Sequence, residues 1–310
     1  MRQNRFLRRC CACCVLFSLV SGRLVAETTT LEASFDRWNY PFNASPGSRL
    51  TGSTFGAVGN ASFDDHDAQI ILGFDTSLLG NPDDILVQSL SVTLTTSTDE
   101  TFVYDPTFDS LGSYLDPQVD GDAGRPVELY GVGFRNGFAF PAFGPTVPGP
   151  IYFEEGEAFV FGNPASERVR NAFASDYGDG ARDISNRVSD NIETTPWAVG
   201  AIEGLAPGDP VPLHSEMRFD IDLDNVAVLD YVHEGLASGG LFFTVASLHA
   251  STQGSSLGIP AFFLGDANLP DLNLSVARLD IDYRAVPEPE SQFAAVVGVI
   301  ALMVVGRWRS

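Results

Sequence analysis

Several segments of the chain alternate apolar and polar residues with a period of two, as a strand with one buried face does. In segment 86–94 every second position is leucine or valine, except position 88, which is Gln. Further strands are expected at Gln69–Phe74, Val127–Phe134, Phe159–Phe161, Met217–Leu223 and Gly240–Leu248. Segments 272–276 and 279–283 alternate on either side of a one-residue slip, which predicts a β-bulge between them.

Three short segments have a helical pattern instead. Asp224–Gly235 begins with a good N-cap residue and ends with glycine, the residue that most often follows a helix. Ala165–Ala174 follows Asn163-Pro164, and proline suits the first turn of a helix. A third helix is expected at Asp183–Ile192.

Short strands and Gly/Pro-rich connections predict a mainly β body with a few short helical insertions. The connections 141–150 and 205–212 separate strand segments. No internal repeat is evident, and no alternation of strands and helices indicates a parallel sheet. We expect a jelly-roll-like β-sandwich that spans residues 27–284.

The N-terminus has the order of a secretory signal peptide. Four arginines within residues 2–9 precede the apolar run 10–20, and cleavage is expected after Ala26 or Gly22. We assign residues 1–26 to this signal. All four cysteines lie within it, so the exported chain has no disulfide and no thiol chemistry.

The C-terminus combines a proline-rich motif, an apolar segment and a basic end. Val286-Pro-Glu-Pro is followed by the apolar run Phe293–Gly306 and then by Arg-Trp-Arg-Ser. Tryptophan favours the membrane interface and arginine the cytoplasmic side, so a short membrane-spanning helix is expected. Residues 285–310 therefore form a separate C-terminal segment.

This C-terminal segment resembles the PEP-CTERM sorting signal of Gram-negative bacteria. The matching positions are Val286, Pro287, Glu288, Pro289, Arg307 and Arg309. The resemblance implies recognition by the export machinery and by an exosortase-like membrane protease. It also implies anchoring through the C-terminal helix, transient or stable, and then a location in the cell envelope or in extracellular polysaccharide. It covers about the last twenty-five residues and implies nothing about the activity of the body.

The order of elements in the body is similar to that of DNRLRE-type carbohydrate-binding-like jelly rolls. Gly73-Phe-Asp ends one strand, segment 85–94 forms the next, and Arg218-Phe-Asp-Ile-Asp precedes a short helix and the strand at Gly240. This chain departs from that pattern at Ser89 and Ser91, where alanine is usual, and it has no recognisable name-giving tract. The similarity concerns the fold and transfers no ligand.

The charge of the chain excludes one class of partner. Its net charge is −22, every basic residue is arginine, and only Glu288 and Glu290 among 40 acidic residues lie outside the body. Such a surface repels phosphate backbones, so nucleic-acid binding is not expected. Two interpretations remain, a solvated acidic surface or the binding of divalent cations.

Calcium is the one cofactor for which the sequence offers ligands, and it would have a structural role. Two runs place several carboxylates within one loop, and they contain Asp116, Asp120 and Asp122, and Asp64, Asp65 and Asp67. In so acidic a chain, such runs also occur as ordinary solvated turns. A sugar-stacking platform is a second hypothesis, formed by Trp38 and Tyr40, although aromatic residues at a strand edge also pack in cores.

No residue can be assigned a catalytic role. The four histidines are scattered without zinc-ligand spacing, and Gly254-Ser-Ser-Leu-Gly258 has no strand–turn–helix context for a nucleophile. We therefore expect a non-enzymatic, exported surface or matrix protein that has extracellular polysaccharide as its candidate ligand. The alternatives are a secreted polysaccharide hydrolase and a purely structural envelope protein.

Overall fold

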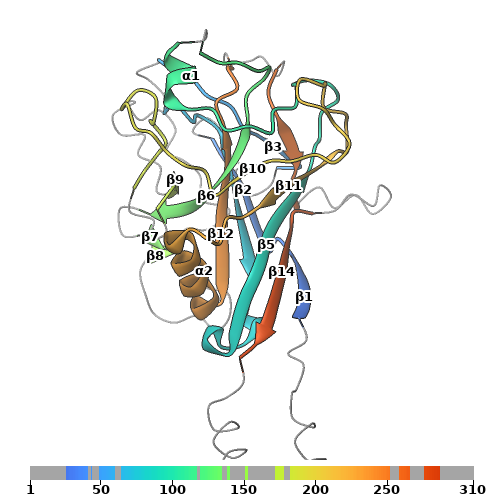
Figure 1. Ribbon diagram of the computed structural model, residues 1–310, viewed down its shortest axis with the longest axis vertical. Helices are drawn as coiled ribbons and strands as arrows, with labels where there is room; N and C mark the ends of the chain where they lie inside the picture. Colours follow the sequence, from blue (N-terminus) through green and yellow to red (C-terminus); the bar gives the residue numbers. More distant parts are fainter. Residues whose placement is uncertain are drawn as a thin grey trace, which may run out of the picture.

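The computed structural model describes residues 26–40, 43, 49–59, 64–116, 119–134, 138–139, 151–152, 172–177, 182–251, 258–265 and 276–286. The expected signal segment up to residue 25, the strand at Phe159–Phe161 and the tail from Pro287 lie outside these residues. The described part is mainly β, as the alternating pattern predicts, and its larger sheets are antiparallel (Figure 1).

The longer strands are β1 (Ala26–Glu32), β2 (Phe35–Asn39), β4 (Gln69–Asp75), β5 (Ile85–Thr95), β6 (Val127–Phe134), β11 (Glu216–Asp220), β12 (Gly240–Ser247) and β14 (Arg278–Ala285). The shorter ones are β3 (Thr51–Ser53), β7 (Phe138–Ala139), β8 (Ile151–Tyr152), β9 (Ala172–Ser175), β10 (Ala198–Val199) and β13 (Ala261–Phe263). The α-helices are α1 (Leu111–Leu115) and α2 (Val226–Ser238), and two 3-10 turns are η2 (Ser77–Leu79) and η3 (Pro82–Asp84).

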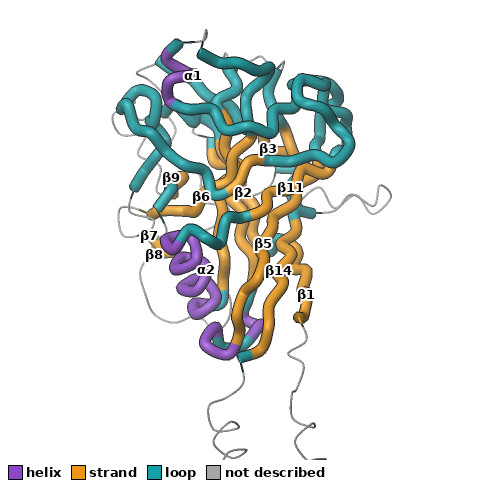
Figure 2. Tube along the Cα trace, in the orientation of Figure 1, coloured by secondary structure: helices purple, strands orange, loops and turns teal. Residues whose placement is uncertain are grey.

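Two sheets contain most of these strands. The first has the order β1-β14-β5-β11, and the second has the order β10-β6-β12-β4-β2, with β9 paired to β6. Two small pairs, β13 with β3 and β7 with β8, lie outside them. Figure 2 shows the long strands running side by side, with loops gathered at one end of the molecule.

One hydrophobic core joins the two sheets. Val92 and Leu279 of the first sheet belong to the same buried cluster as Leu72 and Phe243 of the second. Burial of each such side chain contributes about 1.5–3 kcal/mol relative to exposure. The core therefore fixes which face of each strand points inward.

A β-bulge in β5 changes the alternation that the sequence suggests. The pairing of β5 with β14 passes from Ser89↔Asp282 to Val87↔Tyr283, so Gln88 is the extra residue. Val87 therefore packs against the core, whereas Leu86 is 57% exposed. The bulge expected between segments 272–276 and 279–283 stays a prediction, because residues 272–275 lie outside the described part and β14 begins only at Arg278. Within β14 the register shifts between Asp282 and Tyr283.

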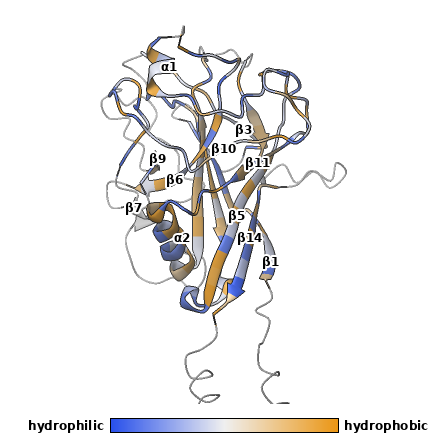
Figure 3. Cartoon of the chain, in the orientation of Figure 1, coloured by the Kyte–Doolittle hydropathy of each residue, from blue (hydrophilic) through white to orange (hydrophobic). Residues whose placement is uncertain are grey.

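Helix α2 begins and ends later than predicted. The side chain of Asn225, not Asp224, accepts a hydrogen bond from the backbone N–H of Ala227 and caps the helix. Gly239, at φ 82°, ends it in the left-handed conformation that favours glycine. The helix continues through Gly235 because its inner face remains buried as far as Leu236. Figure 3 shows a polar and an apolar side on this helix.

In the other two segments for which a helix was predicted, the residues that the structure describes are not helical. Residues 172–175 form β9, in which Ala174 pairs with Val132 of β6, so the helix expected at Ala165–Ala174 was wrong over this part. Asp183–Ile192 consists of turns and an isolated bridge between Ser175 and Asp183. Pairing with the edge of β6 buries residues 172–175 better than a short isolated helix could.

The two ends of the body lie side by side. Strands β1 and β14 are antiparallel neighbours, and Ala26 pairs with Arg284. Figure 1 shows the start of β1 and the end of β14 at the same end of the molecule, opposite the loops that contain α1. Among the residues described here, no helix is long and apolar enough to cross a membrane.

Candidate functional site

The end of the molecule opposite the chain ends contains an acidic cluster of carboxylates from one connection. After β5 the chain passes through loops and α1 before it enters β6 (Figure 1). Asp105, Asp109 and Asp122 come from this connection, and one oxygen of each lies within 4.8 Å of the others. Asp105 and Asp109 are buried and Asp122 is exposed. We call these three residues the Asp105 cluster.

Thr107 joins two members of the Asp105 cluster. Its backbone N–H and its hydroxyl both donate to Asp105 Oδ1, at 2.9 Å and 2.6 Å. The same hydroxyl lies 2.6 Å from Asp122 Oδ2. The other oxygen of Asp105, Oδ2, is buried without a hydrogen-bond partner among the described residues.

Arg125 is the cation beside this cluster. Its Nη1 donates to Asp109 Oδ2 at 2.8 Å and also contacts Asp120, and its guanidinium lies 4.6 Å from the centre of the Tyr114 ring. Burial lowers the pKa of Arg125, but the bond to Asp109 outweighs it, so the pKa is raised. Arg125 therefore keeps its charge and neutralises part of the carboxylates.

Burial governs the acidity of the cluster. It raises the pKa values of both Asp105 and Asp109. Hydrogen bonds from Thr107 and Arg125 oppose the shift, while the neighbouring carboxylates Asp120 and Asp122 add to it. The hydrogen bonds and the one neighbouring cation at this site therefore do not fully stabilise its negative charge.

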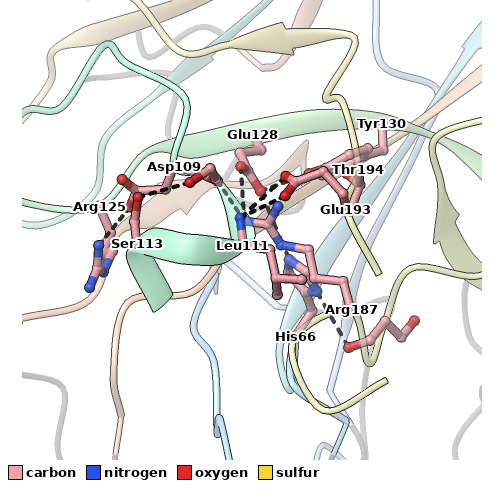
Figure 4. Close-up of polar contacts among 12 residues, drawn as sticks. His66, Asp109, Leu111, Ser113, Arg125, Glu128, Tyr130, Arg187, Glu193 and Thr194 are labelled. Carbon is pink, nitrogen blue, oxygen red and sulfur yellow. Dashed lines mark hydrogen bonds and ion pairs between the residues drawn. The ribbon is translucent and has the colours of Figure 1, made fainter. Parts of the chain in front are cut away.

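A buried ion pair lies behind the cluster. Glu128 of β6 and Arg187 are both fully buried, and Arg187 Nη2 lies 3.4 Å from Glu128 Oε1. The Tyr130 hydroxyl donates to Glu128 Oε2 at 2.8 Å and accepts from Thr194 at 3.2 Å. His66 Nε2 lies 3.9 Å from Glu128 Oε2. Figure 4 shows Glu128 and Arg187 facing each other.

The charges of this pair compensate each other. Burial alone would raise the pKa of Glu128, but Arg187, followed by the contacts with His66 and Tyr130, lowers it overall. The same attraction raises the pKa of Arg187. Both groups are therefore ionised at neutral pH, and neither has access to solvent.

Several contacts fasten the acidic loop to this pair. Arg187 Nη2 lies 3.4 Å from the backbone carbonyl oxygen of Asp109. The guanidinium of Arg187 also lies 4.8 Å from the Tyr114 ring, so this ring contacts Arg125 and Arg187. The backbone N–H of Leu111, at the start of α1, donates to both carboxylate oxygens of Glu193 at 3.2 Å.

His249 lies close to the same region. Neither ring nitrogen has a hydrogen-bond partner among the described residues, and the ring makes an edge contact with Phe102, with centroids 5.6 Å apart. Burial, and then the charge of Arg125, lowers the pKa of His249 to about 3. The imidazole is therefore neutral under ordinary conditions.

The structure brings together only part of the first predicted calcium set. Asp122 belongs to the Asp105 cluster, whereas Asp120 contacts Arg125. The backbone N–H of Asp116 donates to the carbonyl of Gly112 at the end of α1, and Asp116 is not in the cluster. Sequence reasoning missed Asp105 and Asp109, although Asp105-Pro-Thr-Phe-Asp109 is a visible acidic pair close to the predicted loop.

Two carboxylates of the second predicted calcium set accept hydrogen bonds from residues of the turn at 185–191. Asp65 accepts hydrogen bonds from the backbone N–H and hydroxyl of Ser189, at 2.6 Å and 2.7 Å, and Asp64 accepts from Asn186 at 3.2 Å. Asp67 is buried. Among described residues, the only group of three or more potential metal ligands is the Asp105 cluster, so Asp64, Asp65 and Asp67 do not form one.

Trp38 and Tyr40 contact each other, and both also pack against or hydrogen-bond to neighbouring residues. Their rings lie 4.9 Å apart, Tyr40 packs on Phe55, and Trp38 Nε1 donates to the carbonyl of Ser53 at 2.8 Å. The guanidinium of Arg49 lies 5.7 Å from the Trp38 ring. Sugar stacking at these residues stays a prediction.

The predicted sorting motif is described only at its first residue. The backbone N–H of Val286 donates to the carbonyl of Asp84 at 2.7 Å, and the residue is 44% exposed. Pro287, Glu288, Pro289, Arg307 and Arg309 lie outside the described residues.

The chain was also compared with known proteins. No family model matches it, and no curated protein matches it. Its function must therefore be argued from its own residues.

Proposed function

We propose that this chain is an exported surface or extracellular-matrix protein, sorted through its C-terminal segment, whose body is a non-catalytic binding or structural unit. The observation that carries the proposal is the pairing of β1 with β14, which places Ala26 opposite Arg284. Both predicted sorting segments would then leave the body at one end. The loops around the Asp105 cluster lie at the other end (Figure 1).

This arrangement suits a protein held at a membrane while it is processed. A tether that follows β14 would leave the loop end pointing away from the bilayer. Binding residues are commonly placed on loops at one end of a rigid β scaffold. The loop end is therefore the surface at which extracellular polysaccharide would bind.

The finer architecture proposed for the body is a jelly-roll-like sandwich. Two observations support this architecture. The two antiparallel sheets share one core, and β12 lies between β4 and β6, so strands that are neighbours in the sheet are not consecutive in the chain. Such folds serve as binding modules as well as enzymes. We favour a non-catalytic body because the charged groups at the loop end are mostly engaged in salt bridges and hydrogen bonds with one another.

Intact mass combined with fractionation of the native host tests the sorting. We expect an extracellular product that begins near Glu27 and ends before Phe293. A Pro287→Ala/Pro289→Ala variant should remain in the membrane fraction at higher mass. Pro207→Ala, at an exposed loop proline, is the matched control and should behave like the wild type. Persistence of Arg307–Ser310 on an inner-membrane protein would contradict the proposal.

Glycan arrays and turnover assays on the same product test the body. Binding to an extracellular polysaccharide without turnover is the expected result. Turnover would replace the proposal with the polysaccharide hydrolase. The absence of both on a broad panel would favour a purely structural envelope protein.

A further inference from the structure

The spacing within the Asp105 cluster matches the coordination sphere of one metal ion. One oxygen from each of Asp105, Asp109 and Asp122 lies within 4.8 Å of the other two. Calcium binds oxygens at about 2.4 Å, so two ligands of one ion are at most about 4.8 Å apart. Three oxygens at this limiting spacing would each lie about 2.8 Å from a common centre, so a small movement of the side chains brings them to calcium distance.

One buried oxygen of Asp105 has no hydrogen-bond partner among the described residues. Asp105 is 4% exposed, and its Oδ2 makes no hydrogen bond with any residue that the structure describes. An ionised oxygen removed from water is unfavourable unless a cation or donor compensates it. Arg125 bonds Asp109 and Asp120 and is not bonded to Asp105. In the part of the chain that the structure describes, the carboxylate of Asp105 thus has no positively charged partner to compensate its burial.

The Thr107 hydroxyl cannot satisfy both of its carboxylate neighbours. It lies 2.6 Å from Asp105 Oδ1 and 2.6 Å from Asp122 Oδ2. A hydroxyl has a single proton, so it donates to one carboxylate at a time. The second short oxygen–oxygen contact needs another proton or a cation. In a neutral medium that contains divalent cations, a metal ion can fulfil this role.

The excess of negative charge around the cluster also favours a bound cation. Asp105, Asp109, Asp120 and Asp122 face one guanidinium, that of Arg125. Hard oxygen ligands without a sulfur or imidazole in the set favour calcium or magnesium over zinc. An irregular loop does not impose the strict octahedron that magnesium demands.

We propose that Asp105, Asp109 and Asp122 bind one Ca²⁺ ion, which fastens the loop that follows β5 over the Glu128–Arg187 pair. The site shares only Asp122 with the sets that local sequence runs suggested. It is independent of the proposed sorting, because it uses residues at the opposite end of the body (Figure 1).

Calorimetric titration of the full-length chain in detergent with CaCl₂ tests the site. We expect one ion per chain with a Kd below about 1 mM, the range of extracellular calcium modules. Asp105→Asn and Asp122→Asn, which keep side-chain shape, should each weaken binding at least tenfold. Asp230→Asn removes the same charge from the exposed face of α2 and should bind as the wild type does.

Thermal unfolding separates lost binding from lost folding. The two cluster variants should unfold in EDTA at or above the wild-type temperature, because each removes a crowded charge. Calcium at 10 mM should raise the unfolding temperature of the wild type and of Asp230→Asn by roughly 3 °C or more, and that of the cluster variants by much less. Equal binding by wild type, Asp105→Asn and Asp122→Asn, or none by wild type at 10 mM, would overturn the site. Either result would leave the sorting proposal standing.

Discussion

The Asp105 cluster and the Glu128–Arg187 pair lie at the same end of the molecule, yet folding shifts the pKa values of Asp105 and Glu128 in opposite directions. The pKa of Asp105 is raised, whereas the pKa of Glu128 is lowered, although Glu128 is the more deeply buried. The difference comes from their partners. Glu128 has a guanidinium at 3.4 Å and a phenol at 2.8 Å, while among the described residues Asp105 has only the backbone N–H and hydroxyl of Thr107 as hydrogen-bond donors.

This contrast separates a buried carboxylate that has a cation beside it from a cluster in which negative charge predominates. In the Glu128 network, a buried positive charge offsets the cost of burying a negative one. In the Asp105 cluster, negative charge exceeds the positive charge supplied by Arg125. The first network is therefore expected to serve stability, and the second to serve binding.

The largest effect should follow the loss of the buried cation. Arg187→Met leaves Glu128 buried without its counter-charge, and we expect the free energy of unfolding to fall by about 3–5 kcal/mol. Urea unfolding at pH 7 measures the change. Arg218→Met is the control, because Arg218 forms a solvent-exposed ion pair with Asp220, worth less than about 1 kcal/mol. Equal losses in both variants would mean that the buried pair is not what distinguishes this region.

A smaller effect is expected from His249, which lies beside both networks. Its pKa falls from 6.5 to about 3 on folding, so the unfolded chain binds a proton that the folded chain does not. Stability is therefore lost as the pH decreases from about 6.5 toward 3. His249→Phe should remove this contribution, on the order of 3 kcal/mol between pH 7 and pH 4. Urea unfolding at these two pH values is the measurement, and an unchanged pH dependence would show that the pKa of His249 is not lowered on folding.

Asp105→Asn should change how the stability of the folded chain depends on pH. Because the pKa of Asp105 is raised on folding, its ionisation destabilises the folded state at neutral pH, and protonation removes this penalty as the pH falls. In EDTA at pH 7 the variant should be more stable by roughly 1 kcal/mol, the lower end of the cost of an unsatisfied buried group. The gain should vanish below about pH 3.8, where both states are protonated. A variant less stable than the wild type at pH 7 would indicate that the charge of Asp105 is already compensated.

The smallest effect is expected at an exposed ion pair. Glu216 accepts two hydrogen bonds from Arg278, at 2.7 Å and 3.0 Å, which lower the pKa of Glu216. The stabilisation that this ion pair gives the folded state is present above the ordinary glutamate pKa. It is lost as the pH falls through the lowered pKa of Glu216. Glu216→Gln should cost less than about 0.5 kcal/mol in urea unfolding at pH 7, because solvent screens the pair. A loss close to that of Arg187→Met would remove the distinction between buried and exposed pairs.

Local patterns predicted most of the central strands. Period-two alternation and apolar runs located β4, β5, β6 and β12 within one or two residues, because the side chains of one strand face are buried together. They did not predict the bulge at Gln88, which depends on the register between β5 and β14. They also predicted helices where β9 and the turns of 185–191 occur. At β9, pairing to β6 outweighs weak helical propensity.

The amino-acid order alone specifies the acidic charge, the β-rich body, the confinement of cysteine to the N-terminal segment and the residues of the predicted sorting motif. These depend on composition, on period and on neighbouring residues. Only the tertiary structure decided which ionisable groups meet. Glu128 and Arg187 are 59 positions apart, and Asp105 and Asp122 are 17 apart. Local sequence cannot specify such pairs, because burial and long-range contacts set both the partner and the free energy of each charge.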